Sequence, residues 1–340
     1  MATIKDVAEL AKVSTATVSR VINNHPSVTV ETRDNVHKAM DKLCYLPSRS
    51  AIQLNGKKSG ILAALVPNLS NPHFDELVMT LEEEARYYGM NLIIKTHQND
   101  IRVEKSAIQN LISLGVEGLF WVPTSNEAAM ADLLQRSSIN TVVVTQRSKF
   151  FDSVLVDSRV GASLAAQHLI DLGYNNIGFI GQQVVDDEKF SVFNRCLEQN
   201  GLAIDAQNLL WVNKGSGESL MEQTEDVYNI SRAIINNPQP NRAYWIYNDV
   251  FAVSLVRQLA DAGVKVPEDI AVISFDDTYL SQLLNITSVT QPIREIGRLA
   301  YNMIRTPQTC EEINCIELRP RLVARETTLN IRKTQVNYLK

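Results

Sequence analysis

Five side chains near the N-terminus are of types that could contact DNA: Thr15, Ala16, Thr17, Ser19 and Arg20. Hydroxyl groups can hydrogen-bond base edges or phosphates, and an arginine can make a bidentate contact to guanine. Such chemistry requires that one element present these side chains together, as the second helix of a helix-turn-helix does in the major groove. The residues around them must therefore build a rigid scaffold.

The flanking sequence predicts three short helices. Apolar residues from Ile4 to Ala11 recur at the spacing of one helix face, and Thr3 is a suitable N-cap. Ser14 can cap a second helix and Thr29 a third that closes the core. Two short helices joined by a tight turn are typical of a helix-turn-helix. A three-helix bundle without a DNA role fits the spacing as well.

Charge is distributed unevenly along the chain. Residues 1–58 contain nine Lys or Arg and five Asp or Glu, a net charge of +4, whereas the whole 340-residue chain has −5. The remainder therefore has −9. A basic head on an acidic body indicates a polyanion-binding module joined to another function, although a solvated surface could give the same balance.

The head resembles the DNA-binding headpiece of the lactose/galactose repressor (LacI/GalR) family. The resemblance is nearly continuous over residues 2–54, in the strings TIKDVAELAKVSTATVSRVIN and VTVETRDNVHKAMDKLCYLP. It implies that Thr15 and Ala16 select operator bases and that Arg20 contacts a base, while other residues hold phosphates or make secondary contacts. The DNA-binding residues implied in this way are Ile4, Ser14, Thr15, Ala16, Thr17, Ser19, Arg20, Asn23, Thr32, Tyr45 and Leu54.

Lys12 departs from the family pattern, and Ala16 limits which operator bases the head can read. Lys12 stands in the turn where the family usually has glycine. In a left-handed conformation it would cost about 1 kcal/mol relative to glycine. Ala16 has no hydrogen-bonding group, so it can read a base only by apolar contact, for example with a thymine methyl.

Residues 47–59 form the expected hinge. Pro47 stops the third helix, and Ser48 could cap a helix of a few residues that is too short to be stable alone. A plain linker is the alternative. The resemblance implies that this segment folds on operator DNA, pairs with its dimer mate and wedges Leu54 into the minor groove.

The body, residues 60–330, alternates apolar runs with amphipathic helical patterns, which predicts parallel sheets with crossover helices. The runs are too many for one compact sheet, so we expect two doubly wound α/β subdomains after the all-α headpiece of residues 1–46. Residues 331–340 are a short tail. The predicted strands are Ile61–Val66, Asn91–Thr96, 118–122, 141–145, 177–180, 243–247 and 270–275.

Polar residues that follow strands are the candidate ligand contacts, because open parallel sheets bind ligands beyond the carboxyl ends of their strands. Each of them could equally be a helix cap or turn residue. The body also resembles the family core, in strings such as NPHF and YNDVFAVSLVRQLADAGVKVPEDIAVISFDD, and that core is similar to periplasmic sugar-binding proteins with an effector between two subdomains. The effector-binding residues implied are His73, Phe74, Asp157, Lys189, Asn248, Asp276 and Gln291.

Lys189 marks the most informative departure within the body. The family usually has an arginine here that forks onto ligand hydroxyls, whereas lysine is a point charge. Three acids, Asp186 to Glu188, precede it and either form a solvated loop or disfavour anionic ligands. We therefore expect a neutral mono- or disaccharide rather than a phosphorylated or nucleotide effector.

An enzymatic body has little support. Asp276 and Asp277 are adjacent carboxylates, and the five histidines and four cysteines show no metal-ligand spacing such as HExxH or CxxC. The sequence also lacks a GxSxG motif and a P-loop. We expect no catalytic residue, no metal site and no cofactor.

Compartment and assembly follow from similar arguments. The longest apolar run, Ile61–Val66, is far shorter than the ~20 residues that span a bilayer, and the first residues contain no signal-peptide core. A sugar receptor without a DNA role is therefore less suitable than a cytoplasmic, ligand-switched repressor that binds double-stranded operator DNA as a homodimer. The alternative effector is a corepressor such as a nucleoside or purine. The resemblance places Val253 and Leu284 at the dimer interface, although both could be ordinary core residues.

Overall fold

A computed structural model describes residues 2–23, 25–45, 59–124, 127–137, 139–182, 187–212, 220–306 and 313–328. The chain divides into two compact units, Met1–Ser59 and Gly60–Lys340. The expected hinge lies outside the described residues except for Ser59, so the role of Leu54 stays a prediction. The expected tail also lies outside them.

The first unit is the three-helix headpiece expected from the sequence. It contains α1 (Ile4–Leu10), α2 (Thr15–Ile22) and α3 (Val30–Lys42). Buried valines from all three helices form its core. The predicted N-caps all accept a hydrogen bond from the backbone of the first helical turn, and they are Thr3, Ser14 and Thr29.

The second unit contains two six-stranded sheets. In the first sheet all strands are parallel, in the order β11-β5-β4-β3-β1-β2. Its strands are β1 (Ile61–Val66), β2 (Asn91–Thr96), β3 (Gly118–Trp121), β4 (Asn140–Val144), β5 (Asp152–Val156) and β11 (Cys315–Leu318).

The second sheet has the order β12-β10-β9-β8-β6-β7, and only β12 runs antiparallel to its neighbour. This antiparallel edge strand is the one departure from the parallel sheets that we predicted. Its strands are β6 (Asn176–Gln182), β7 (Leu209–Val212), β8 (Arg242–Ile246), β9 (Ile270–Asp276), β10 (Thr287–Thr290) and β12 (Arg321–Val323).

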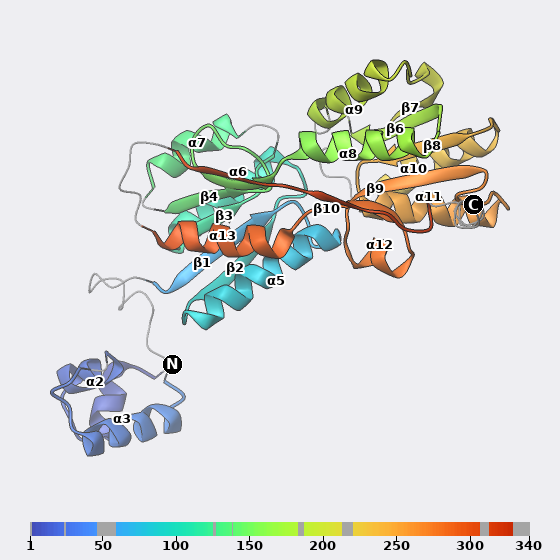
Figure 1. Cartoon of the computed structure of the whole chain (residues 1–340). Coiled ribbons are helices and arrows are strands. Elements are labelled where there is room, and N and C mark those ends of the chain that lie inside the picture. The colour runs from blue at the N-terminus through green and yellow to red at the C-terminus, as the bar shows by residue number, and fades with distance from the viewer. Residues whose placement is uncertain are drawn as a thin grey trace, which may run out of the picture. The chain divides into compact units, whose positions relative to one another are not determined.

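Helices cover both faces of each sheet (Figure 1). On the first sheet, α5 (Pro72–Tyr87) and α13 (Ile293–Arg305) pack on one face, and α6 (Ile101–Ser113) and α7 (Ala128–Gln135) on the other. The second sheet lies between two further helix pairs. They are α8 (Ser158–Asp171) with α9 (Asp187–Gln199), and α10 (Leu220–Ile235) with α11 (Asp249–Asp261).

The two subdomains are interleaved in sequence. The chain passes from the first sheet to the second after Val156, returns after Thr290 to form α13 and β11, and crosses again after Leu318 to form β12. Figure 1 shows α13 lying beside α5, although the two helices are far apart in the sequence. Parallel β-α units with helices on both faces match the expected doubly wound architecture.

Candidate functional site

The exposed face of α2 presents the predicted base-reading residues, Thr15 and Ala16 in its first turn and Arg20 in its last. Thr15, Ala16 and Arg20 are exposed, while Val18 and Val21 on the opposite face are buried in the headpiece core. The helix is therefore anchored on one side and open on the other, as a helix that enters the major groove must be.

One predicted phosphate contact, Ser14, is a helix cap, and two others, Thr17 and Thr32, are bonded to caps. The Ser14 hydroxyl accepts from the backbone N–H of Thr17 at 3.1 Å, and the two side-chain hydroxyls are 2.9 Å apart. Thr32 and Thr29 repeat this arrangement at the start of α3. The hydrogen bonds of these caps fix the positions of the Ser14, Thr17 and Thr32 hydroxyls, whose contacts to DNA stay predictions.

The remaining predicted DNA contacts lie on the borders of the headpiece core. Ile4 and Tyr45 are half-buried against that core. The half-buried Ser19 hydroxyl accepts from Asn23 Nδ2 at 3.4 Å, within the last turn of α2. Part of each of these side chains is at the surface, and their contacts to DNA stay predictions.

The turn before α2 has the left-handed conformation that the glycine comparison implied. Lys12 has φ +52°. Asn35, which the sequence did not mark as important, donates from Nδ2 to the Ala11 carbonyl at 2.9 Å and so ties α3 to this turn. The turn therefore keeps its shape although it lacks a glycine.

In the second unit, side chains from the two sheets meet at the carboxyl ends of their strands. His73 lies in the first turn of α5, beyond β1, and its Nδ1 is 3.9 Å from Oδ1 of Asp276 at the end of β9. Gln291, beyond β10, donates from Nε2 to the same oxygen at 2.6 Å. We call His73, Phe74, Lys189, Asp276 and Gln291 the junction cluster.

The junction cluster is tightly packed. His73 and Asp276 are 5% and 8% exposed, and Phe74 meets the His73 ring edge-on at a centroid distance of 5.2 Å. Lys189 Nζ lies 4.3 Å from the centre of the Phe275 ring. Burial, together with the smaller effect of the positive charge of Lys189, lowers the pKa of His73 to about 4. His73 is therefore neutral near pH 7.

Two other predicted effector residues act as helix caps in this structure. Asp157 accepts from the backbone N–H groups of Arg159 and Val160, and it forms an ion pair with Arg159. Asn248 accepts from the Phe251 N–H at 3.0 Å and is almost buried. The cap interpretation, which the sequence left open, describes both, and a ligand contact by either stays a prediction.

The acids before Lys189 are only partly described. Asp186 lies outside the described residues, and only the backbone of Asp187 is described. Glu188 is 66% exposed and lies 3.8 Å from Arg159, which also pairs with Glu317. Glu188 is solvated as expected, but it lies in the first turn of α9 rather than in a loop, so the loop interpretation is wrong for this residue.

Asp249 is a buried polar residue that the sequence analysis passed over in favour of its neighbour Asn248. It is 1% exposed and accepts hydrogen bonds from the hydroxyls of Ser274, Ser288 and Thr278. A sequence signal existed, because Asp249 also follows β8, but its partners lie on strands distant in the sequence.

Known proteins match the chain over nearly its whole length. The model of bacterial regulatory proteins of the lacI family matches residues 3–48, and that of a periplasmic binding protein-like domain matches residues 166–328. The regulator DegA of Bacillus subtilis is 30% identical, covering 96% of this chain and 98% of DegA. The repressor PurR of Photobacterium profundum is also 30% identical, covering 97% and 100%.

The chain belongs to the lacI family of bacterial regulatory proteins. Its fold agrees with the lac repressor dimer bound to operator and the anti-inducer ONPF, with a TM-score of 0.80 at 25% identity over 96% of this chain and 99% of that one. The lacI-family relatives are transcriptional regulators, which confirms the expectation of a regulator rather than an enzyme.

The residues of this lacI-family regulator expected at a dimer interface differ in exposure. Val253, on α11, is half-buried against the core between α10, α11 and the sheet. Leu284 is 50% exposed and follows α12 (Tyr279–Leu283), whose Tyr279 and Leu283 are 56% and 74% exposed. The ordinary-core alternative therefore fails for Leu284, and its interface role stays a prediction.

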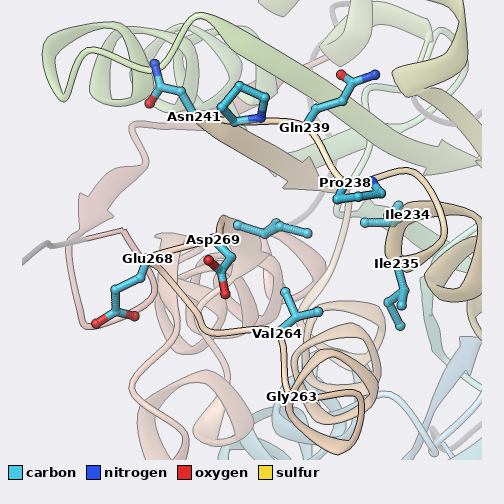
Figure 2. Close-up of a pocket in the computed structure, with 11 residues that line it drawn as sticks. Ile234, Ile235, Pro238, Gln239, Asn241, Gly263, Val264, Glu268 and Asp269 are labelled. Carbon is cyan, nitrogen blue, oxygen red and sulfur yellow. The ribbon is translucent and has the colours of Figure 1, made fainter.

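A separate pocket of about 550 Å³ opens at the other end of the second sheet. Figure 2 shows Glu268 and Asp269 on one side of it and Ile234, Ile235 and Pro238 on the other. These residues adjoin the amino ends of β8 and β9, opposite the junction cluster. It contains none of the predicted effector residues of this lacI-family regulator.

No described helix is long and apolar enough to cross a membrane. Among the same residues, no group of three or more His, Cys, Asp or Glu side chains is placed to hold a metal ion.

Proposed function

We propose that this regulator is a cytoplasmic repressor that binds a near-palindromic operator as a homodimer and is switched by a neutral sugar at the junction cluster. The observation that carries the proposal is the open face of α2, where Thr15 and Ala16 in the first turn and Arg20 in the last turn are exposed on a capped and buried scaffold.

The dimer follows from the size of the headpiece. One helix-turn-helix reads a single half-site, and two heads related by a two-fold axis read a palindrome. The similar lac repressor structure is a dimer bound to operator. Relatives named as repressors, such as PurR, support the direction of control.

The effector half of the proposal rests on the contact between the two sheets. His73 and Asp276 are buried against each other, so a small molecule reaches the Asp276 carboxylate only when these side chains separate. Such a ligand prefers one arrangement of the subdomains and shifts the population toward it. Asp276 and Gln291 suit hydroxyl groups, because carboxylate and amide oxygens accept from them and the amide and Lys189 donate.

A second candidate effector is a nucleoside or purine that acts as a corepressor. The edge-on rings of His73 and Phe74 at the junction favour it, because a flat base could stack on either ring once the pair opens. Lys189 is a positive point charge, so it offers such a ligand no planar, forked contact of the kind that an arginine makes.

The proposal is tested by selecting bound sequences from a random double-stranded DNA library with the full-length protein. We expect a near-palindromic site with two half-sites. Arg20→Ala should lose about 10- to 100-fold in affinity for that site, whereas Lys38→Ala on the exposed face of α3 removes one charge and should weaken all DNA equally. Recovery of no common sequence would overturn the proposal.

A further inference from the structure

The carboxylate of Asp249 is the centre of a buried clamp around the segment that carries Asp276. Its Oδ1 accepts from the Ser274 hydroxyl and, at 3.0 Å, from the Ser288 hydroxyl. Its Oδ2 accepts from the backbone N–H of Thr278 at 2.6 Å and from the Thr278 hydroxyl at 2.8 Å. One carboxylate thus receives four hydrogen bonds, the number of lone-pair positions it offers.

The clamp joins two strands of the second sheet and two helices next to them. Asp249 opens α11, Ser274 lies in β9, Ser288 lies in β10 and Thr278 is the N-cap residue of α12. All four side chains are at most 4% exposed. The carboxylate therefore fixes both ends of the segment from Ser274 to Thr278, which contains Asp276.

That segment has an unusual backbone. Asp276 has φ +110° and Asp277 has φ +57°, two consecutive non-glycine residues at positive φ. Such conformations are costly and persist only where the surroundings determine them. The Asp277 N–H donates to the Ser288 hydroxyl at 3.1 Å, so the constraint on this turn also passes through the clamp.

The two sides of the turn face different regions. On one side Asp276 reaches His73 and Gln291 in the junction cluster. On the other side Thr278 begins α12, which exposes Tyr279 and Leu283. Because Asp276 and Thr278 are two residues apart, we expect a displacement of Asp276 to move Thr278 and so the start of α12.

We propose that Asp249 is a positioning residue that couples the junction cluster to α12. It positions the Asp276 carboxylate for the effector by holding the turn at positive φ. When that turn shifts, Asp249 passes the movement to α12 and to the exposed Leu284 that follows it. This inference rests on the proposed function, in which Asp276 contacts the effector and Leu284 contacts a second copy of the chain.

The test is hydrogen exchange of the full-length protein with Asp249→Asn. The asparagine amide keeps the shape but replaces one of the two acceptor oxygens with a donor, so the clamp loses acceptors on one side, and this loss should accelerate amide exchange over residues 278–284 by about tenfold or more. Asp261→Asn, at the exposed end of the same helix, is the matched control and should leave this exchange unchanged. Equal acceleration throughout the second sheet would mean that Asp249 only supports the core.

A second pair of variants keeps the inference testable if Asp249→Asn folds poorly. Thr278→Ser retains both donors and should exchange like the wild type, whereas Thr278→Val removes only the hydroxyl and should accelerate residues 278–284. Equal exchange in these two variants would overturn the role of the clamp.

Coupling itself is measured by a double-mutant cycle. Asp276→Asn should change exchange in α12 in the wild-type background but not in the Asp249→Asn background. Additive effects would contradict coupling through Asp249. None of these measurements uses DNA or an effector, so a failed operator selection would reject the proposed function without deciding this inference.

Discussion

Nδ1 of His73 lies 3.9 Å from Oδ1 of Asp276, and this contact joins the two sheets of the second unit. The residues come from the first turn of α5 and the end of β9, and both are nearly buried. Burial of the imidazole, together with the nearby positive charge of Lys189, lowers the pKa of His73 to about 4.

This low pKa predicts how stability depends on pH. Because the folded pKa of His73 is below the value of the unfolded chain, the unfolded state binds more protons between about pH 4 and 6.5. The contribution is fully present above pH 6.5 and is lost as the pH falls toward 4, up to about 3 kcal/mol. We measure the free energy of unfolding with denaturant at several pH values. Between pH 4 and 6.5 this free energy should rise more steeply with pH for wild type than for His73→Gln. Equal slopes would contradict the burial of a neutral imidazole.

Lys12 gives a prediction of opposite sign to the usual effect of glycine. At φ +52° a lysine is strained, so Lys12→Gly should stabilise the headpiece by about 0.5–1 kcal/mol. In α1, Lys5→Gly should instead destabilise it by about 1 kcal/mol. Calorimetry of the full-length protein, following the headpiece transition, distinguishes the two. Destabilisation by both variants would mean that the turn is not strained.

Ala16 should recognise thymine through its methyl group. Replacing each operator thymine in turn with deoxyuracil removes one methyl group, and at the position that Ala16 reads the affinity should fall about fourfold, the effect of about 0.8 kcal/mol. Ala16→Gly lacks the contact and should not respond to the same replacement. Fluorescence anisotropy at fixed salt gives both values, since affinity for DNA depends steeply on ionic strength. If both proteins lose the same affinity, Ala16 is not the reader.

The local helices and most strands of this fold can be predicted from the sequence. The caps Thr3, Ser14 and Thr29 are confirmed, and the seven predicted strands lie within two residues of observed ones. The strands β5, β7, β10, β11 and β12 are not among the predicted ones. The last two are short edge strands with partly exposed residues, and they pair with β5 and β10 from other parts of the chain.

Five of the seven residues that the family resemblance implied for effector binding lie in the junction cluster, but their chemistry could not be predicted. Asn248 and Asp249 both follow β8, and only the folded chain shows that the first caps α11 while the second accepts from Ser274 and Ser288. The low pKa of His73 likewise depends on burial between two sheets. These properties arise from contacts between distant segments, which periodicity and spacing do not encode.

Effector release should depend on Asp276 and not on the headpiece. Asparagine keeps the shape of the side chain and tolerates positive φ. It lacks the negative charge that strengthens hydrogen bonds from ligand hydroxyls to the aspartate oxygens. Asp276→Asn should therefore bind operator with wild-type affinity and remain bound when a sugar is added. A variant that no longer binds operator would indicate that Asp276 holds the fold rather than the ligand.

The most direct measurement combines both halves of the account in one titration. The full-length protein, bound to its selected operator, is titrated with a panel of neutral mono- and disaccharides while anisotropy reports the bound fraction. The account predicts that at least one sugar changes the operator affinity of the wild type and leaves that of Asp276→Asn unchanged. A sugar that shifts both proteins equally, or a panel in which only nucleosides or phosphorylated compounds act, would contradict a neutral sugar at the junction cluster.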